Sequence, residues 1–254
     1  MAVKFADVDR GRLAYERAGA GPPVVFLHGL AQSRDVWTGV ARFLAPSFDT
    51  IRLDLRGHGA ASEPQEPFAH HDDVARVLDD LGLARAHVVG LSMGGAVSVD
   101  LALAHPSRVS SLALVDSALE GHPWSKEWID AFHAVRRIGR ERGPLAARDA
   151  WAELPLFGGV GRDLLARDPG TRWVAPHLAR PLEPKAFGRL PEIRVPALVV
   201  VGERDAPDFH AIARALAAGI PGARAVTLPG VGHLSPLEAP GLLADTLREF
   251  LSHA

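Results

Sequence analysis

Residues 87–104 read HVVGLSMGGAVSVDLALA, and this stretch indicates the fold. Its centre is a Gly-x-Ser-x-Gly pattern made by Gly90, Ser92 and Gly94. The five-residue pattern alone occurs by chance in many glycine-rich chains. Here an apolar strand pattern leads in and a helical pattern leads out, which is the setting that a sharp nucleophile turn requires. The stretch therefore predicts that Ser92 is a nucleophile at a helix N-terminus, with an ordinary helix-capping serine as the alternative.

The composition is that of a globular protein with one core and room for an insertion. The chain has 254 residues, of which 47% are hydrophobic and 23% charged. A net charge of −2 gives no reason to expect nucleic acid or an anionic membrane as a partner. The absence of cysteine excludes disulfides, a thiolate nucleophile and zinc–cysteine sites. Because no signal-peptide pattern and no apolar stretch of roughly 18 residues occurs, we expect a cytoplasmic protein without a membrane span.

Short apolar runs alternate with helical patterns along most of the chain, which is typical of a parallel sheet flanked by helices. The runs at 24–27 and 198–201 lack polar alternation, as buried parallel strands do. The predicted strands are Leu13–Arg17, Val24–Leu27, Thr50–Leu55, His87–Leu91, Leu112–Val115, Ala197–Val201 and Ala225–Leu228. The predicted helices are Asp35–Leu44, Asp72–Leu81, Met93–Ala104, Phe209–Ala218 and Leu237–Leu251.

Residues 117–190 interrupt this alternation, with several prolines and no strand pattern. We interpret them as a helical cap inserted into a core made of residues 1–116 and 191–254. Four of the five tryptophans of the chain lie in this stretch: Trp124, Trp128, Trp151 and Trp173. They either attach the cap to the core or line an apolar pocket, and we expect the first three to line the pocket.

A serine nucleophile needs a neutral imidazole that accepts its proton. Of the twelve histidines, His233 lies in the glycine-rich segment 229–233, between the last predicted strand and the last predicted helix. Loops after parallel strands meet at one edge of the sheet, so this position lies at the same edge as Ser92. The sequence therefore predicts His233 as the general base, with a solvated loop histidine as the alternative.

The acid that orients the base is expected between the strand at 197–201 and His233. Asp205 follows that strand in the segment Gly202-Glu203-Arg204-Asp205, and its role would be to set the imidazole tautomer and stabilise the imidazolium. Three other carboxylates are alternatives. Glu203 is expected in a structural ion pair and Asp208 as the N-cap of the next helix. Asp116, at the end of the preceding strand, could act as the acid if the loop geometry were unusual.

Acyl transfer also needs two backbone N–H groups that face the developing oxyanion. We expect these from Met93, the residue after the nucleophile, and from Leu30, in the loop after the strand at 24–27. Gly29 would permit that turn, and His28 is expected to be a structural histidine that braces it. No histidine or acidic spacing predicts a metal site, and no glycine-rich segment fits a phosphate loop.

Taken together, these pieces resemble the α/β-hydrolase superfamily over essentially the whole chain. The matching segments are Leu13-Ala14-Tyr15-Glu16, Gly21-Pro22-Pro23-Val24-Val25, His28-Gly29, Asp54-Leu55-Arg56-Gly57-His58-Gly59, Gly90-Leu91-Ser92-Met93-Gly94-Gly95, Gly202-Glu203-Arg204-Asp205 and Gly232-His233. They are most similar to the esterase, enol-lactonase and carbon–carbon-bond hydrolase branch with a small helical cap. The resemblance implies an α/β-hydrolase fold, a Ser–His–Asp triad and no cofactor.

Two features bear on which group of the superfamily the chain resembles. Haloalkane dehalogenases and most epoxide hydrolases of the superfamily carry aspartate where this chain has Ser92, which argues against both activities. Members of the branch often have threonine or serine and then proline shortly after the acid, whereas this chain reads Asp205-Ala206-Pro207-Asp208. The departure leaves the acid assignment unchanged but weakens any assignment to a narrower group.

The expected function is hydrolysis of a small or medium carboxylic ester or lactone through an acyl-enzyme, with this small molecule as the partner and neither nucleic acid nor a membrane. Two alternatives stay open: hydrolysis of a carbon–carbon bond in a vinylogous diketone ring-cleavage product, and a slow-turnover ligand receptor of the same fold. The predicted cap has twelve Lys and Arg residues against nine Asp and Glu, which is more typical of a solvated surface than of a carboxylate site. The physiological substrate and the oligomeric state are not indicated by the sequence.

Overall fold

The computed structural model describes residues 2–254, which form one eight-stranded sheet with the strand order β1-β2-β4-β3-β5-β6-β7-β8. The strands are β1 Lys4–Val8, β2 Gly11–Ala18, β3 Pro23–Leu27, β4 Asp49–Leu53, β5 Ala86–Leu91, β6 Val109–Val115, β7 Ala197–Gly202 and β8 Arg224–Leu228. Strand β2 pairs antiparallel with both β1 and β4, and all other neighbours are parallel. The prediction of a mostly parallel sheet flanked by helices is therefore confirmed.

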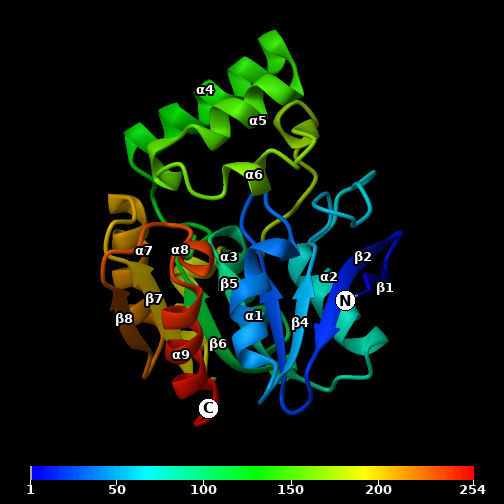
Figure 1. Ribbon diagram of the computed structural model, residues 1–254, viewed down its shortest axis with the longest axis vertical. Coiled ribbons are helices and arrows are strands. Elements are labelled where there is room, and N and C mark those ends of the chain that lie inside the picture. Colours follow the sequence, from blue (N-terminus) through cyan, green and yellow to red (C-terminus); the bar gives the residue numbers. More distant parts are fainter. Residues whose placement is uncertain (1) are drawn as a thin grey trace.

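Helices cover both faces of this sheet (Figure 1). Helices α1 (Thr38–Leu44) and α9 (Pro240–Leu251) pack on one face, and α2 (His70–Asp80), α3 (Met93–Ala104) and α7 (Pro207–Gly219) pack on the other. Successive residues of β3 belong alternately to the two apolar clusters, because neighbouring side chains of a strand point to opposite faces. Both faces of β3 are therefore buried, which explains its uninterrupted apolar sequence at 24–27.

The structure differs from the sequence predictions at both ends of the chain. Strand β1 is absent from those predictions, because it is an edge strand in which only Ala6 is buried. The single helix predicted at 237–251 is divided into α8 (Ser235–Glu238) and α9, since Pro240 lacks the N–H that a continuous helix needs and begins a new one. The helix predicted at 35–44 begins as a 3₁₀ turn, Arg34–Trp37, before α1.

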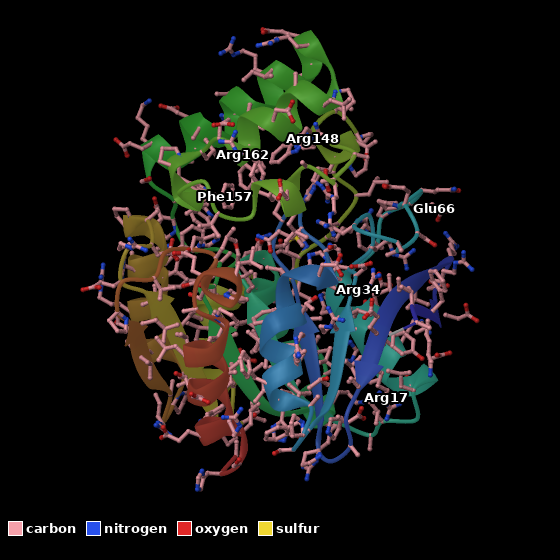
Figure 2. The ribbon with its side chains drawn as sticks, viewed as in Figure 1. Arg17, Arg34, Glu66, Arg148, Phe157 and Arg162 are labelled. Carbon is pink, nitrogen blue, oxygen red and sulfur yellow. The ribbon has the colours of Figure 1, made fainter. Side chains whose placement is uncertain are left out.

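Residues 117–190 contain the helices α4 (Lys126–Arg142), α5 (Pro144–Ala152) and α6 (Arg162–Leu165). These helices form a layer apart from the sheet, at the top of the view in Figure 1. Phe157 lies on the side of this layer that faces the sheet (Figure 2). Ser125 joins the layer to α7, because its N–H and Oγ–H donate to the two carboxylate oxygens of Asp208, both at 2.7 Å. The assignment of this segment as a separate cap domain stays a prediction.

None of the helices within residues 2–254 combines the length and the apolar character that a membrane crossing requires.

Candidate active site

Ser92 occupies a strained turn between β5 and α3. Its backbone angles are φ 52° and ψ −116°, a region that non-glycine residues rarely adopt and that costs free energy. The surrounding backbone holds this conformation: Ser92 N–H donates to the carbonyl of Val115 in β6, at 3.0 Å, and the Ser92 carbonyl accepts from the N–H groups of Gly95, Ala96 and Ala118. The serine side chain is half-buried and lies at the N-terminus of a 12-residue helix.

The glycines around Ser92 are required by close backbone approach. A Cβ at Gly94 would lie 2.3 Å from the carbonyl oxygen of Leu27 in β3, and a Cβ at Gly90 would lie 2.3 Å from the carbonyl oxygen of Gly94. Both distances are far below van der Waals contact and involve backbone atoms that have no room to move. The Gly-x-Ser-x-Gly pattern is therefore a packing requirement of the turn, which links the sequence motif directly to the position of the serine.

His233 and Asp205 are in direct contact. His233 Nδ1 lies 3.1 Å from Asp205 Oδ1 and 2.9 Å from Oδ2, and both side chains are buried. A carboxylate can only accept, so the hydrogen lies on Nδ1 and leaves Nε2 as the acceptor in the neutral ring. Burial lowers the pKa of His233, but the charge and hydrogen bond of Asp205 outweigh burial and raise that pKa above its ordinary value of 6.5.

Ser92 and His233 line the same cavity. Within residues 2–254, no hydrogen bond at 3.5 Å or less joins Ser92 Oγ to the imidazole. Hydrogen bonds between a nucleophile and its base often shorten only when substrate binds, so the lack of this bond does not exclude Ser92 as nucleophile and His233 as base.

Asp116, the alternative acid, is not bonded to the imidazole. Its side chain is fully buried at the end of β6, and Oδ1 accepts from the N–H of Gly202 at 2.8 Å. Within the described residues, Oδ2 has no hydrogen-bond partner. Burial, reinforced by the charge of Asp205, raises the pKa of Asp116 to about 8, which favours the protonated form of this carboxyl. A protonated carboxyl does not provide the negative charge that stabilises an imidazolium.

Two other carboxylates have roles that differ from the sequence predictions. Asp208 is not the N-cap of α7, because the helix begins at Pro207 and its N-cap is Ala206. Its carboxylate binds Ser125 instead. Glu203, expected in an ion pair, uses its Oε2 to accept from the N–H of Gly230 at 2.6 Å.

The two backbone N–H groups expected to face an oxyanion are free. Among residues 2–254, neither Leu30 N–H nor Met93 N–H finds an acceptor, and both residues line the cavity that contains Ser92. The loop that carries Leu30 is braced by His28, whose Nδ1 donates to the carbonyl of Gly29 at 2.8 Å and whose Nε2 accepts from Leu55 N–H at 3.0 Å. Because Nε2 accepts, His28 is neutral, and burial lowers its pKa.

The cavity has a volume of about 500 Å³ and is largely aromatic. Seven aromatic residues that surround it come from the helical layer and from α7: Trp124, Trp128, Phe132, Trp151, Phe157, Trp173 and Phe209. The rings of Trp124 and Trp128 stack with their centroids 5.1 Å apart, and Phe209 packs edge-on against Trp128 with a centroid distance of 5.5 Å. The three tryptophans predicted for the pocket therefore lie on its lining. Phe209 also packs against the His233 ring, with the ring centroids 4.1 Å apart.

The cavity lining also contains polar residues that sequence reasoning did not assign to the site. His58 Nδ1 donates to the carbonyl of Arg56 at 3.0 Å, and Nε2 accepts from Arg172 Nη1 at 2.6 Å. Arg172 also donates to the carbonyl of Gly57 and pairs with Asp168, which compensates its charge. Burial lowers the pKa of His58, and both ring nitrogens are already used. Only the DLRGHG segment at 54–59 could have signalled this contact.

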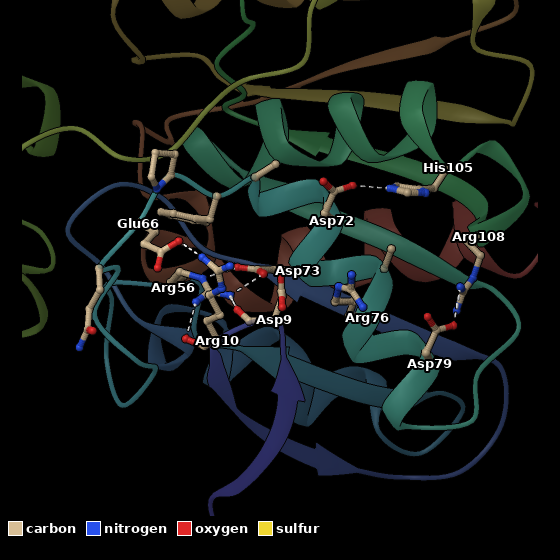
Figure 3. Close-up of a pocket in the computed structure, with 15 residues that line it drawn as sticks. Asp9, Arg10, Arg56, Glu66, Asp72, Asp73, Arg76, Asp79, His105 and Arg108 are labelled. Atoms are coloured by element: carbon tan, nitrogen blue, oxygen red, sulfur yellow. Dashed lines mark hydrogen bonds and ion pairs between the residues drawn. The ribbon is translucent and has the colours of Figure 1, made fainter.

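A second groove, about 640 Å³ in volume, lies along α2 (Figure 3). Most of its charged side chains pair with one another, among them Arg56 with Asp73 at 2.7 Å, His105 with Asp72 at 2.7 Å and Arg108 with Asp79 at 2.6 Å. No serine, threonine or cysteine lines this groove in the described chain. Nor does any group of three His, Asp or Glu side chains within residues 2–254 form a metal site. The cavity that contains Ser92 is therefore the candidate active site.

Comparison with known proteins agrees with this architecture. A family model described as alpha/beta hydrolase fold matches residues 22–140. An enol-lactonase from Burkholderia xenovorans LB400 superposes with a TM-score of 0.80 and 29% identity, over 98% of this chain and all of that one. A thermophilic esterase from Thermogutta terrifontis gives a TM-score of 0.83 and 27% identity, over 100% of this chain and 99% of its own.

An N-acyl homoserine lactone degrading enzyme is 30% identical, with a TM-score of 0.71, over 97% of this chain and 100% of its own. These similarities extend over the sheet, its helices and the helical layer, beyond the motif around Ser92. The chain therefore belongs to the α/β-hydrolase fold family and is a hydrolase whose structural neighbours include esterases and lactonases.

Proposed function

We propose that this hydrolase cleaves small or medium carboxylic esters or lactones through an acyl-enzyme on Ser92. The observation that carries the proposal is the contact of His233 Nδ1 with both oxygens of Asp205, in a cavity that also contains Ser92. The carboxylate holds the ring with Nε2 unprotonated, which is the form that can accept a proton from a serine hydroxyl.

In the first half of the reaction, Ser92 Oγ attacks the carbonyl carbon while its proton moves to His233 Nε2. The negative charge that develops on the carbonyl oxygen is stabilised by the N–H groups of Leu30 and Met93, at the positive end of the α3 dipole. The carbon–oxygen bond to the alcohol then breaks, and the leaving alkoxide takes the proton from His233. For a lactone, the alcohol stays attached to the acyl chain.

In the second half, water attacks the acyl group and gives its proton to His233. The bond to Ser92 Oγ breaks, the serine recovers the proton, and the carboxylic acid leaves. The pair Asp205–His233 serves both steps, since the imidazolium that forms in each is stabilised by the same buried carboxylate.

The size and the aromatic lining of the cavity suit substrates of limited size with an apolar group. A volume of about 500 Å³ suits a small or medium ester, and the aromatic lining favours an apolar acyl or alcohol group. Among the polar lining residues, Arg172 is compensated by Asp168, and the nitrogens of His58 are already used. The lactonase and esterase names of the structural neighbours agree with this substrate class.

The test is hydrolysis of p-nitrophenyl acetate, butyrate and octanoate by the wild type, Ser92→Ala and Ser47→Ala. Ser47 is an exposed serine outside the cavity and serves as the matched control. We expect turnover by the wild type and Ser47→Ala but not by Ser92→Ala, together with one acyl group on Ser92 in intact-mass spectra of quenched wild-type reactions. Unchanged turnover by Ser92→Ala, or a folded wild type inactive on these esters and on simple lactones, would show that the proposal is wrong.

A further inference from the structure

Gln32 lies in the loop that carries the proposed oxyanion donor Leu30, and no motif in the sequence points to it. Its side chain is 4% exposed and lines the cavity that contains Ser92 and His233. Gln32 Oε1 accepts from Gly29 N–H at 3.1 Å, and Gln32 N–H donates to the carbonyl of Gly29 at 3.3 Å. These two hydrogen bonds close the turn on which the free N–H of Leu30 is presented.

The contact with Gly29 determines which way the Gln32 amide points. Because the Gly29 group is an N–H donor, the atom that meets it is the amide oxygen, and Nε2 lies on the other side. Within residues 2–254, Nε2 has no hydrogen-bond acceptor. It is also not among the polar atoms that are both inaccessible and without a partner, so it is accessible. It is therefore open to the cavity, and its two N–H groups are available to a bound molecule.

Two histidines near this loop are already engaged in hydrogen bonds. His58 uses both ring nitrogens, and the histidine behind the loop, His28, does the same. Gln32 is thus a buried amide that presents unused N–H donors to the cavity, two residues from one proposed oxyanion donor. A nearly dry, preorganised donor is worth far more to a developing negative charge than a donor in water.

We propose that Gln32 is a catalytic residue that donates from Nε2 to the oxyanion formed on Ser92. This proposal rests on the proposed function. It is a third donor beside the N–H groups of Leu30 and Met93. Its Oε1 at the same time holds Gly29, so one side chain both positions the loop and contacts the substrate.

Two substitutions separate these roles. In Gln32→Glu the carboxylate still accepts from Gly29 N–H, so the brace persists, but the donor is replaced by an acceptor. In Gln32→Met both the brace and the donor are lost without adding a charge. The experiment measures kcat and KM for p-nitrophenyl butyrate from about pH 7 to about pH 9.5, because burial raises the pKa of the introduced glutamate and its ionised form is reached only at the higher pH values. Ser33→Ala is the control, because Ser33 is the next residue of the loop and does not line the cavity.

We expect kcat to fall by about 100-fold or more in both Gln32 variants, with KM changed much less, since a donor to the oxyanion acts in the transition state. Ser33→Ala should stay within about twofold of the wild type. Thermal unfolding of each variant checks that the fold persists.

Three results would overturn the proposal. Wild-type kcat in Gln32→Glu with a loss in Gln32→Met would show that the side chain only braces the loop. A loss in Gln32→Glu alone would reflect charge repulsion rather than a missing donor. Wild-type kcat in both variants would remove Gln32 from the reaction. The Ser92→Ala variant tests the proposed function separately. If turnover does not depend on Ser92, the proposed function is wrong and the role of Gln32 is wrong as well.

Discussion

His233 Nδ1 lies within 3.1 Å of both carboxylate oxygens of Asp205, and no other described side chain bonds to this ring. Asp205 Oδ1 also accepts from Ala206 N–H at 2.6 Å, so the carboxylate is held by its own loop as well. A second buried carboxyl, that of Asp116, lies behind this pair and holds the N–H of Gly202. Burial and the neighbouring charge of Asp205 both penalise a negative charge on Asp116 and raise its pKa.

Replacement of Asp205 by asparagine should lower kcat by about 10⁴-fold, because an amide permits the wrong imidazole tautomer and provides no charge for the imidazolium. The matched variant is Asp116→Asn, which replaces a neutral acid that does not contact the ring and should cost far less. Steady-state kinetics with p-nitrophenyl butyrate check both. Equal losses in the two variants would contradict the assignment of Asp205 as the orienting acid.

The pH dependence of kcat/KM should follow the deprotonation of His233. Since Asp205 raises the pKa of this imidazole above 6.5, the rise in kcat/KM is expected to have its midpoint above that value. In Asp205→Asn the raising charge is lost while burial still lowers the pKa, so the midpoint should move toward lower pH. Profiles from about pH 5 to about pH 9 with an uncharged ester measure both midpoints. A flat wild-type profile would argue against His233 as the base.

Gly94→Ala should destabilise the fold severely, by more than about 3 kcal/mol, because the new Cβ would meet backbone atoms of β3. Gly188 offers the contrast: it lies in a 3₁₀ turn without a positive φ, and no atom lies within 4 Å of the place that a Cβ would occupy. Gly188→Ala should be neutral or stabilising by about 0.4–1 kcal/mol, through loss of unfolded-state entropy. Urea unfolding of both variants tests this, and a mild effect at Gly94 would contradict the packing argument.

Replacement of Asp100 by asparagine should stabilise the protein by an amount that depends on pH. It is buried in α3, its Oδ2 accepts from Leu182 N–H at 3.2 Å, and burial raises its pKa from 3.8 to about 6. Between those values the folded protein binds more protons at this site than the unfolded chain, so the free energy of unfolding falls as pH rises.

Asp100→Asn removes that fall. Relative to the wild type, this variant should gain about 2 kcal/mol between about pH 4 and about pH 8. Urea unfolding at several pH values measures the difference, and parallel stability curves for the two proteins would contradict the role of burial at this site.

Much of the fold and several site positions could be predicted from the sequence. The strands at 24–27 and 197–201 carry uninterrupted apolar runs, because both of their faces are buried. The turn at Ser92 requires glycine on both sides, because backbone atoms approach within 2.3 Å of any Cβ there. Such requirements act on one short segment at a time, so they leave a readable pattern.

The pairings between distant segments could not be predicted in this way. Asp208 binds Ser125 across 83 residues, and the sequence alone suggested a helix cap for it. Asp116 is neutral because of what surrounds it, although its residue type suggests a charge. The Gln32 amide faces the cavity only because Gly29 N–H selects its oxygen.

By itself, then, the sequence determined the parallel sheet and the strained serine turn, and it predicted the order in which the candidate serine, acid and histidine follow one another. Local sterics and hydrophobic periodicity are written in neighbouring residues and need no knowledge of the rest of the molecule. Only the tertiary structure decided which carboxylate contacts His233, which tryptophans share one cavity and which N–H groups remain free. Hydrogen-bond partners and burial are properties of packed segments, and these set the protonation and orientation on which the proposed chemistry depends.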